Sequence, residues 1–165
     1  MYFNGKGVKQ KYSESLRENK KVADLGDASS YYNLGVMFKK SKSIKQDYVN
    51  ATKWFKKASE QGHARAQFYL GMLYENGYGV EQDYAKAFKW YKKAAKRGDA
   101  PAQYNLGVLF KNGKGVKQNY AESVRWLLKS VERGYAMSQY NLCYMYNNSE
   151  GVKQDYSEAI KVFKK

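Results

Sequence analysis

The sequence repeats itself at a fixed interval, and this constrains the fold more than any other feature. Leucine recurs every 36 positions, at Leu34, Leu70, Leu106 and Leu142. A glutamine column with the same interval has five identical members, Gln10, Gln46, Gln82, Gln118 and Gln154. A unit this short cannot bury its apolar side chains alone, so consecutive units must stack on one another to complete a core.

Each unit is predicted to form two helices, here called helix A and helix B, joined by a short turn. In the unit that starts at Ala100, Pro101 suits the first turn of helix A, because its missing N–H would have no helical partner there. We expect this helix to end near Asn112. A turn is predicted at residues 113–116, where glycine permits a positive φ.

Helix B of the same unit is predicted from Tyr120 to Glu132. Asn119 directly precedes it and is placed to cap its first turn, as Asp47 and Asp83 are in the two preceding units. Gly134 follows the predicted end, where a left-handed residue commonly terminates a helix.

The segment from Ala100 to Tyr120 reads A-x-A-Q-Y-N-L-G-x-x-F-x-x-G-x-G-V-x-x-x-Y and closely resembles the Sel-1-like repeat family. The resemblance covers essentially the whole chain. It implies an all-α, right-handed superhelical α-solenoid of tandem helix–turn–helix repeats, related to tetratricopeptide repeats. Members usually serve as adaptors or binding scaffolds, and many are bacterial. One bacterial branch bridges its helices with cysteine pairs, which this sequence lacks because Cys143 is its only cysteine.

We expect one repeat domain over residues 1–165. It is divided into a partial repeat at 1–27, repeats at 28–63, 64–99 and 100–135, and a truncated repeat at 136–165. Solenoids normally need polar caps at their ends. Because this chain starts and stops inside repeats, we expect it to be a segment of a longer protein. The alternative is that the incomplete repeats at the two ends contact another molecule.

A stripe along helix A is the predicted partner-binding site. At 100° per residue, Ala66 and Leu70 lie on one side of the helix, and Arg65 and Tyr69 lie on the other. The candidate residues across the repeats are Asn33, Arg65, Tyr69, Met72, Asn105, Val108, Asn141 and Tyr144. Amides suit a peptide backbone, while Met and Tyr suit its side chains. The resemblance implies that helix A lines the concave groove; packing between adjacent repeats is the alternative role.

Tyr69 is the sharpest candidate, because it interrupts a column that is otherwise asparagine.

Charge adds a second candidate surface. The net charge of +15, from 30 Lys and Arg against 15 Asp and Glu, favours acidic partners, although solubility alone also accounts for it. Basic residues concentrate on helix B at Lys53, Lys57, Lys86, Lys89, Lys93 and Arg97. They form either a solvated face or a basic ridge for phosphates or an acidic protein.

Three functions follow from these surfaces. The first is a non-catalytic scaffold or adaptor that binds a protein or peptide, possibly an acidic one. The second is an inhibitor or immunity protein that occludes an acidic enzyme. The third is nucleic-acid binding, which is less favoured because the sequence has no clustered motif of basic and aromatic residues.

No catalytic, metal or cofactor site is predicted. His63 is the single histidine and lies in an inter-repeat turn, and Cys143 is expected to be a buried, inert thiol. One histidine and one cysteine do not supply a Cys/His pair or a usual zinc site. Gly5-Lys6-Gly7 and Gly113-Lys114-Gly115 are predicted to be turns, because neither completes a phosphate-loop motif.

The compartment stays open. The N-terminus has no basic start followed by an apolar run, and no stretch approaches the roughly 18 apolar residues of a membrane span. We therefore predict neither a signal peptide within this chain nor membrane insertion. A single cysteine slightly favours the cytoplasm, with the periplasm or secretion as alternatives if a leader was removed. The oligomeric state is unknown.

Overall fold

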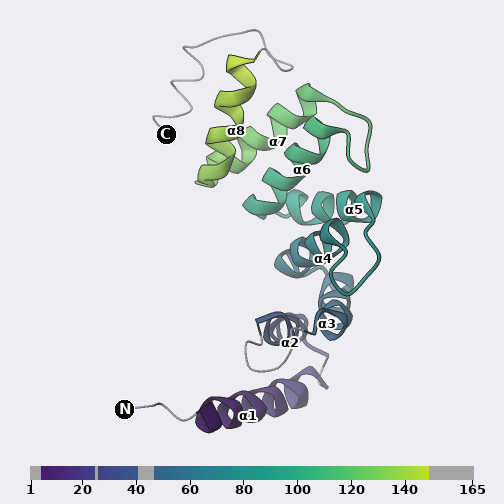
Figure 1. Cartoon of the computed structure of the whole chain (residues 1–165), viewed down its shortest axis with the longest axis vertical. Helices are drawn as coiled ribbons and strands as arrows, with labels where there is room; N and C mark the ends of the chain where they lie inside the picture. Colours follow the sequence, from purple (N-terminus) through teal and green to yellow (C-terminus); the bar gives the residue numbers. More distant parts are fainter. Residues whose placement is uncertain (1–4, 25, 41–46, 149–165) are drawn as a thin grey trace. The chain divides into compact units, whose positions relative to one another are not determined.

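The computed structural model describes residues 5–24, 26–40 and 47–148, and the regular elements among them are all α-helices (Figure 1). They are α1 (Gly5–Ala23), α2 (Ala28–Lys40), α3 (Tyr48–Glu60), α4 (Ala64–Asn76), α5 (Tyr84–Lys96), α6 (Ala100–Asn112), α7 (Tyr120–Glu132) and α8 (Ala136–Asn147). Helix A of successive repeats is α2, α4, α6 and α8, and helix B is α1, α3, α5 and α7. The predicted all-α class is confirmed.

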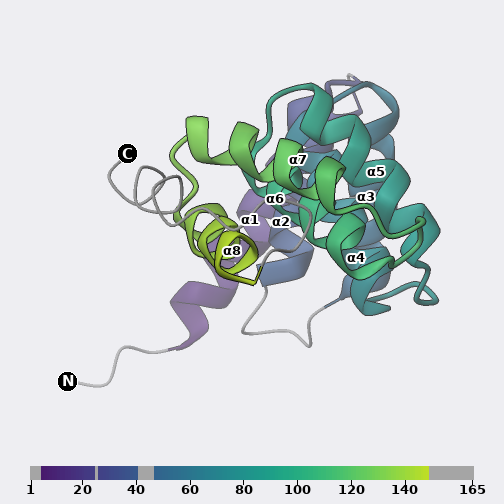
Figure 2. The ribbon, with the colours of Figure 1, turned by 90° about the horizontal axis from the view of Figure 1, so that it is seen from above.

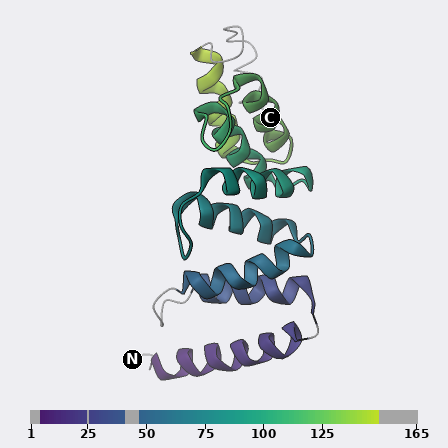
Figure 3. The same cartoon turned by 90° about the vertical axis from the view of Figure 1, so that its right-hand side faces the viewer.

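The chain forms two compact units, residues 1–82 and 83–165. In the first unit, α2 packs against α1 and α3, and α4 packs against α3 (Figure 3). In the second unit, α6 packs against α5 and α7, and α7 also packs against α8 (Figure 2). Neighbours in sequence are therefore neighbours in space within each unit. A single repeat domain over residues 1–165 stays a prediction.

Side-chain caps fix where helix B begins. The carboxylate of Asp47 accepts a hydrogen bond from the backbone N–H of Asn50 at 2.9 Å, and Asp83 accepts one from Lys86 at 2.8 Å. These backbone N–H groups hold the pKa of both carboxyls below the ordinary value, because they stabilise the charged form. The predicted cap Asn119 accepts from the backbone N–H of Glu122 at 3.0 Å.

Close approach of helix A to helix B explains the column of small residues. A Cβ on Gly35 would lie 2.6 Å from the ring of Phe55, and one on Gly107 would lie 2.8 Å from Cγ of Leu127. Fully buried Leu and Ala residues surround these contacts, as the apolar periodicity predicts. The repeats at 28–63 and 100–135 therefore build their cores between their own two helices, α2 with α3 and α6 with α7, and the next helix along the chain.

The turn after helix A is stabilised by hydrogen bonds from a glutamine side chain to the last turn of that helix. The side-chain amide of Gln82 donates to the carbonyl of Glu75, and that of Gln118 donates to the carbonyl of Lys111, both at 2.8 Å. These bonds close the turn onto the end of helix A, which gives the glutamine column a structural role. Gly115 lies against the backbone at Tyr84, at the start of the preceding helix B.

The prediction of a turn at Gly5-Lys6-Gly7 is wrong. These residues belong to α1, which runs without interruption to Ala23. The matching turn after α6 is held by a contact of Gly115 with the backbone at Tyr84, so the three residues alone do not determine a turn. Helix B predicted for the last repeat lies outside the described residues.

Candidate functional site

The candidate site in the first unit centres on Tyr69 of α4, whose side chain is half-buried. Its ring stacks on Phe55 of α3, with ring centroids 5.1 Å apart and an interplanar angle of 15°. Two cations approach it as well: Lys39 Nζ lies 4.1 Å from the ring centroid and the Arg65 guanidinium carbon lies 5.7 Å away. Tyr69 thus has a packing role between repeats in addition to a partly open surface.

The other first-unit candidates are Asn33 on α2 and Met72 on α4. Asn33 is exposed, and its side chain forms no hydrogen bond with any residue in the described part of the chain. Met72 is half-buried, and its backbone carbonyl accepts a hydrogen bond from the side chain of Asn76 at 2.8 Å. An exposed amide with free donors and acceptors is suited to a peptide backbone.

In the second unit, two of the four candidates lie on α6 and two lie on α8. Asn105 and Val108 on α6 are half-buried, and the Asn105 amide has no hydrogen-bond partner among the described residues. The Asn141 amide on α8 donates to the hydroxyl of Tyr104 at 3.2 Å, so it ties α8 to α6. Tyr144 is exposed, and Lys111 Nζ lies 4.0 Å from its ring centroid.

An exposed apolar patch lies on α8. Met137 is 52% exposed, Tyr140 65% and Tyr144 47%, at positions i, i+3 and i+7 of the helix. Asn141 lies between them in this spacing. The α8 patch, as we call these four residues, combines aromatic and thioether groups with an amide, which is a composition typical of binding hot spots.

Tyr140 was not among the residues that the sequence singled out. Its column contains Tyr32 and Tyr104, which pack on the turn before the next helix A. Tyr32 stacks on His63 at 4.6 Å between ring centroids, and Tyr104 lies 5.4 Å from Tyr135. The position that would match His63 and Tyr135 is 171, which lies outside this sequence, so the exposure of Tyr140 does not by itself mark a binding surface.

The predicted basic residues are exposed on helix B, and several have local partners. Lys57 lies over the ring of Trp54 and Lys93 over that of Trp90, at 4.8 and 4.3 Å from the indole centroids. Lys86 forms an ion pair with its own helix cap Asp83 at 3.1 Å. The remaining three predicted basic residues, Lys53, Lys89 and Arg97, are also exposed. The lysine that follows each tryptophan by three residues thus covers an aromatic face, which is a structural role.

The titratable groups have structural roles. His63 is the N-cap of α4, because its Nδ1 accepts a hydrogen bond from the backbone N–H of Ala66 at 3.1 Å. Burial lowers the pKa of His63, and Asp27 opposes this shift by favouring the imidazolium. Burial raises the pKa of the Cys143 thiol, which favours its protonated form.

The described residues contain no cluster of three or more His, Cys, Asp and Glu side chains that could hold a metal ion. None of the described helices is both long and apolar enough to cross a lipid bilayer.

Comparison with known proteins identifies the repeat. The model of the Sel1 repeat matches residues 1–17, 28–63, 64–99, 100–135 and 136–165. A similar solved structure is a protective antigen present in uropathogenic Escherichia coli strains and displaying an SLR fold, with 40% identity over 90% of this chain and a TM-score of 0.85. Another is a Sel1 repeat protein from Oxalobacter formigenes, with 32% identity over 90% of this chain and a TM-score of 0.84.

A third structure, Helicobacter pylori cysteine rich protein B, is 24% identical over 82% of this chain and 97% of its own, with a TM-score of 0.64, and shows the fold alone. The present chain spans 32% of the Escherichia coli structure and 61% of the Oxalobacter structure. No curated protein sequence matches it significantly. With repeats matched along nearly its whole length, the chain belongs to the Sel1 repeat family and has its α-solenoid fold.

Proposed function

We propose that this chain is a non-catalytic interaction scaffold that binds an extended segment of a partner protein along helix A. Sel1 repeats generally act as protein-interaction scaffolds. The observation that carries the proposal is the pair of exposed apolar side chains Met137 and Tyr144 on α8, which lie on the same face as the Asn141 amide. Apolar clusters of this kind on a helix commonly mark an interaction site.

The chemistry of helix A suits a peptide. The amides of Asn33 and Asn105 have free hydrogen-bonding capacity within the described residues, so they can pair with backbone N–H and C=O groups of a bound segment. Met137 and Tyr144 offer adaptable and rigid apolar contacts, respectively. Arg65, Tyr69 and Met72 in the first unit and Val108 in the second unit are further candidates, each half-buried and therefore partly accessible.

The experiment begins with capture of partners from the native cell and their identification by mass spectrometry. The affinity of each purified partner is then measured by calorimetry for the original chain and for Tyr144→Val with Asn105→Ala. Valine occupies the Tyr144 column at Val36 and Val108, so the repeat tolerates it. We expect the affinity to fall at least roughly tenfold, because hot-spot truncations cost more than about 1.4 kcal/mol.

Leu128→Lys is the matched control. Leu128 is a partly exposed apolar residue of α7, and lysine occupies its column at Lys56 and Lys92. We expect this change on helix B to leave the affinity within about twofold, since surface changes outside a contact have small effects. Equal affinities for the helix A variant and the original chain would remove the helix A surface from consideration.

A further inference from the structure

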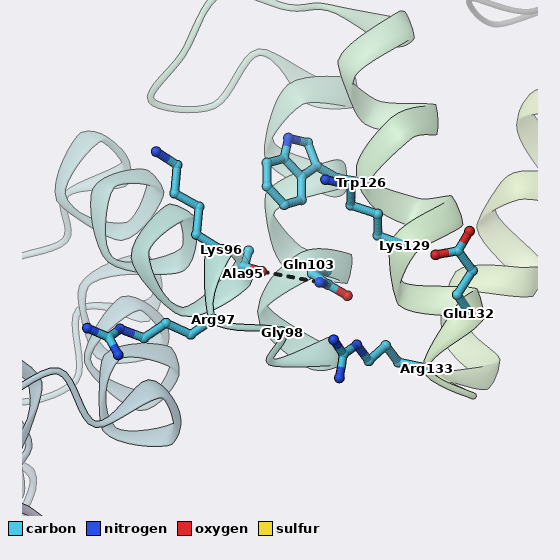
Figure 4. Close-up of a pocket in the computed structure, with 9 residues that line it drawn as sticks. All are labelled: Ala95, Lys96, Arg97, Gly98, Gln103, Trp126, Lys129, Glu132 and Arg133. Carbon is cyan, nitrogen blue, oxygen red and sulfur yellow. Dashed lines mark hydrogen bonds between the residues drawn. The ribbon is translucent and has the colours of Figure 1, made fainter.

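A polar pocket of about 480 Å³ lies in the second unit, where the C-terminal ends of α5 and α7 meet the side of α6 (Figure 4). It is separate from the α8 patch and shares no residue with it. The lining residues comprise four cations, one carboxylate, one tryptophan, one glutamine and backbone at Ala95 and Gly98.

The four cations are Lys96 and Arg97 at the end of α5 and Lys129 and Arg133 at the end of α7. None of them forms an ion pair with another residue in the described part of the chain. Glu132 is the single acidic residue of the lining, so the local charge is strongly positive. An anionic group that enters the pocket meets cations from both helices.

Gly98 allows one of these cations to approach closely. A Cβ at this position would lie 2.8 Å from Nη2 of Arg133 and 3.0 Å from its guanidinium carbon. The guanidinium therefore lies directly against the backbone of the turn that follows α5. Arginine offers a planar fork of donors, which matches the two oxygens of a carboxylate.

Gln103 supplies a buried polar group. Only 4% of this residue is exposed, and its Nε2 donates to the carbonyl of Ala95 at 3.2 Å. That bond orients the amide, and Oε1 then has no hydrogen-bond partner among the described residues. A buried acceptor without a partner is unfavourable. The same arrangement recurs in the first unit, where Gln67 Nε2 donates to the carbonyl of Ser59 at 3.0 Å and Gln67 Oε1 has no partner among the described residues, so the unpartnered acceptor is a feature of the repeat and not of this pocket alone.

Trp126 argues against a nucleic acid as the occupant. The residue is only 7% exposed, its Nε1 donates to Glu122 at 3.2 Å, and Lys129 Nζ lies 4.7 Å from its ring centroid. Its aromatic faces are therefore not open as a platform on which a base can stack, which is the usual aromatic contribution to single-strand binding.

Comparison between repeats shows that the basic pair on α5 is not required by the architecture. The residues that end α3 at the matching positions are Glu60 and Gln61, in place of Lys96 and Arg97. Basic residues at a helix C-terminus are favoured by the helix dipole, but α3 ends without this pair. The adjacent Lys-Arg pair that ends α5 is thus absent from the matching positions at the ends of α3 and α7, where the residues are Glu60-Gln61 and Glu132-Arg133.

We propose that this pocket binds a carboxylate side chain of an acidic segment in the partner protein. The carboxylate lies among the lysine and arginine head groups that line the pocket. The proposal rests on the proposed function in that the chain binds protein segments, and it names the chemistry of one such segment. It depends on none of the helix A candidates.

The test uses the full chain and a fluorescein-labelled hexaglutamate peptide, with anisotropy measured at about 0.15 M salt to screen long-range attraction. The pocket variant is Lys96→Glu with Arg97→Gln, which introduces the residues of the matching positions on α3. The control is Lys20→Glu with Lys56→Gln, which changes the net charge equally at exposed sites on helix B that belong to no candidate surface. We expect the pocket variant to bind roughly tenfold more weakly and the control to stay within about twofold.

Tryptophan provides a second, local readout. Trp54, Trp90 and Trp126 each have a lysine three residues later over the indole ring, but only Trp126 lines the pocket. In NMR spectra of the labelled chain, hexaglutamate should therefore shift the indole N–H signal of Trp126 more than the other two. Because the three sites share the same lysine contact, they serve as internal controls for non-specific charge effects.

Three results would overturn the proposal. Equal losses in the two charge variants, or equal shifts of the three indoles, would mean that the peptide responds only to the overall positive charge. A thymidine oligonucleotide of equal charge that binds with the same dependence on Lys96 and Arg97 would make the pocket a nucleic-acid site. If the pocket proposal fails but Tyr144→Val with Asn105→Ala still weakens binding of the captured partner, the scaffold proposal stands. If instead the pocket variant weakens hexaglutamate binding and the helix A variant has no effect on the captured partner, the pocket proposal stands without the helix A surface.

Discussion

Two glycines in one turn permit a controlled measurement of how tightly successive repeats pack. Gly113 and Gly115 both have a left-handed backbone, with φ of +66° and +68°. A Cβ on Gly113 would lie 3.3 Å from Cβ of Gln118, whose side chain can adjust. A Cβ on Gly115 would overlap the backbone carbonyl of Tyr84 and lie 2.7 Å from the nitrogen of Ala85. Alanine at either site therefore has the same backbone strain, but only alanine in place of Gly115 also collides with backbone atoms.

The expected magnitudes follow from this difference. A left-handed conformation costs an alanine roughly 1–2 kcal/mol, and the loss of unfolded-state freedom relative to glycine offsets about 0.4–1 kcal/mol of that. Gly113→Ala should therefore lower the free energy of unfolding by about 1 kcal/mol. Gly115→Ala adds overpacking, which typically costs 1–3 kcal/mol. Because the obstacle is backbone at the start of α5, we expect about 3 kcal/mol in total.

Urea denaturation followed by far-UV circular dichroism measures both variants against the original chain. If the slopes agree, the difference of about 2 kcal/mol appears as a lower midpoint for Gly115→Ala. In thermal unfolding, the same difference corresponds to roughly 4–8 °C for a chain of this size. Equal decreases in the free energy of unfolding for the two substitutions would refute the reasoning, because they would show that the turn can shift away from the Tyr84 backbone with no loss of stability.

Two further predictions concern the caps of helix A. In the folded chain, burial lowers the pKa of His63 from its ordinary value of 6.5. Protonation of the ring removes the Nδ1 acceptor for the backbone N–H of Ala66. The stability that the neutral ring contributes is therefore present above pH 6.5 and is lost as the pH falls below it. His63→Asn keeps a neutral cap, so the free energy of unfolding measured at pH 7.5 and pH 5.5 should differ less than in the original chain; an unchanged pH dependence would contradict this. Asp99→Ala removes the acceptor for the backbone N–H of Ala102 at 2.9 Å and should cost about 1 kcal/mol in urea denaturation, whereas Asp99→Asn, which retains the cap, should cost much less.

The helices of the second unit were predictable from local sequence signals. The expected bounds of helix A at Ala100–Asn112 and of helix B at Tyr120–Glu132 agree with α6 and α7. Both rest on features that act within one turn: Pro101 in the first turn, Asn119 as a cap, and a glycine after each helix. Signals of this range need no knowledge of the neighbouring repeat, which is why they identify element boundaries well here.

The functional surface was less accessible to sequence reasoning, because it depends on which side chains the neighbouring repeat covers. Asn33 and Asn105 occupy the same column, yet the first is exposed and the second is half-buried. The cap at His63 was also missed, although its column contains Asp27 and Asp99, which were available as a signal. The pocket at Gln103 joins residues from three helices, so no single motif marks it.

The first repeat shows that the turn is a property of the array rather than of its own residues. Gly5-Lys6-Gly7 matches Gly113-Lys114-Gly115 letter for letter, yet it is helical. In the later repeat, Gly115 rests on the backbone at Tyr84, 31 positions earlier, so the conformation of this turn depends on a contact outside the tripeptide. Glycine within a helix costs only about 1 kcal/mol. That penalty is small enough for the same three residues to be helical in α1 and to form a turn after α6, so the tripeptide alone does not decide between the two conformations.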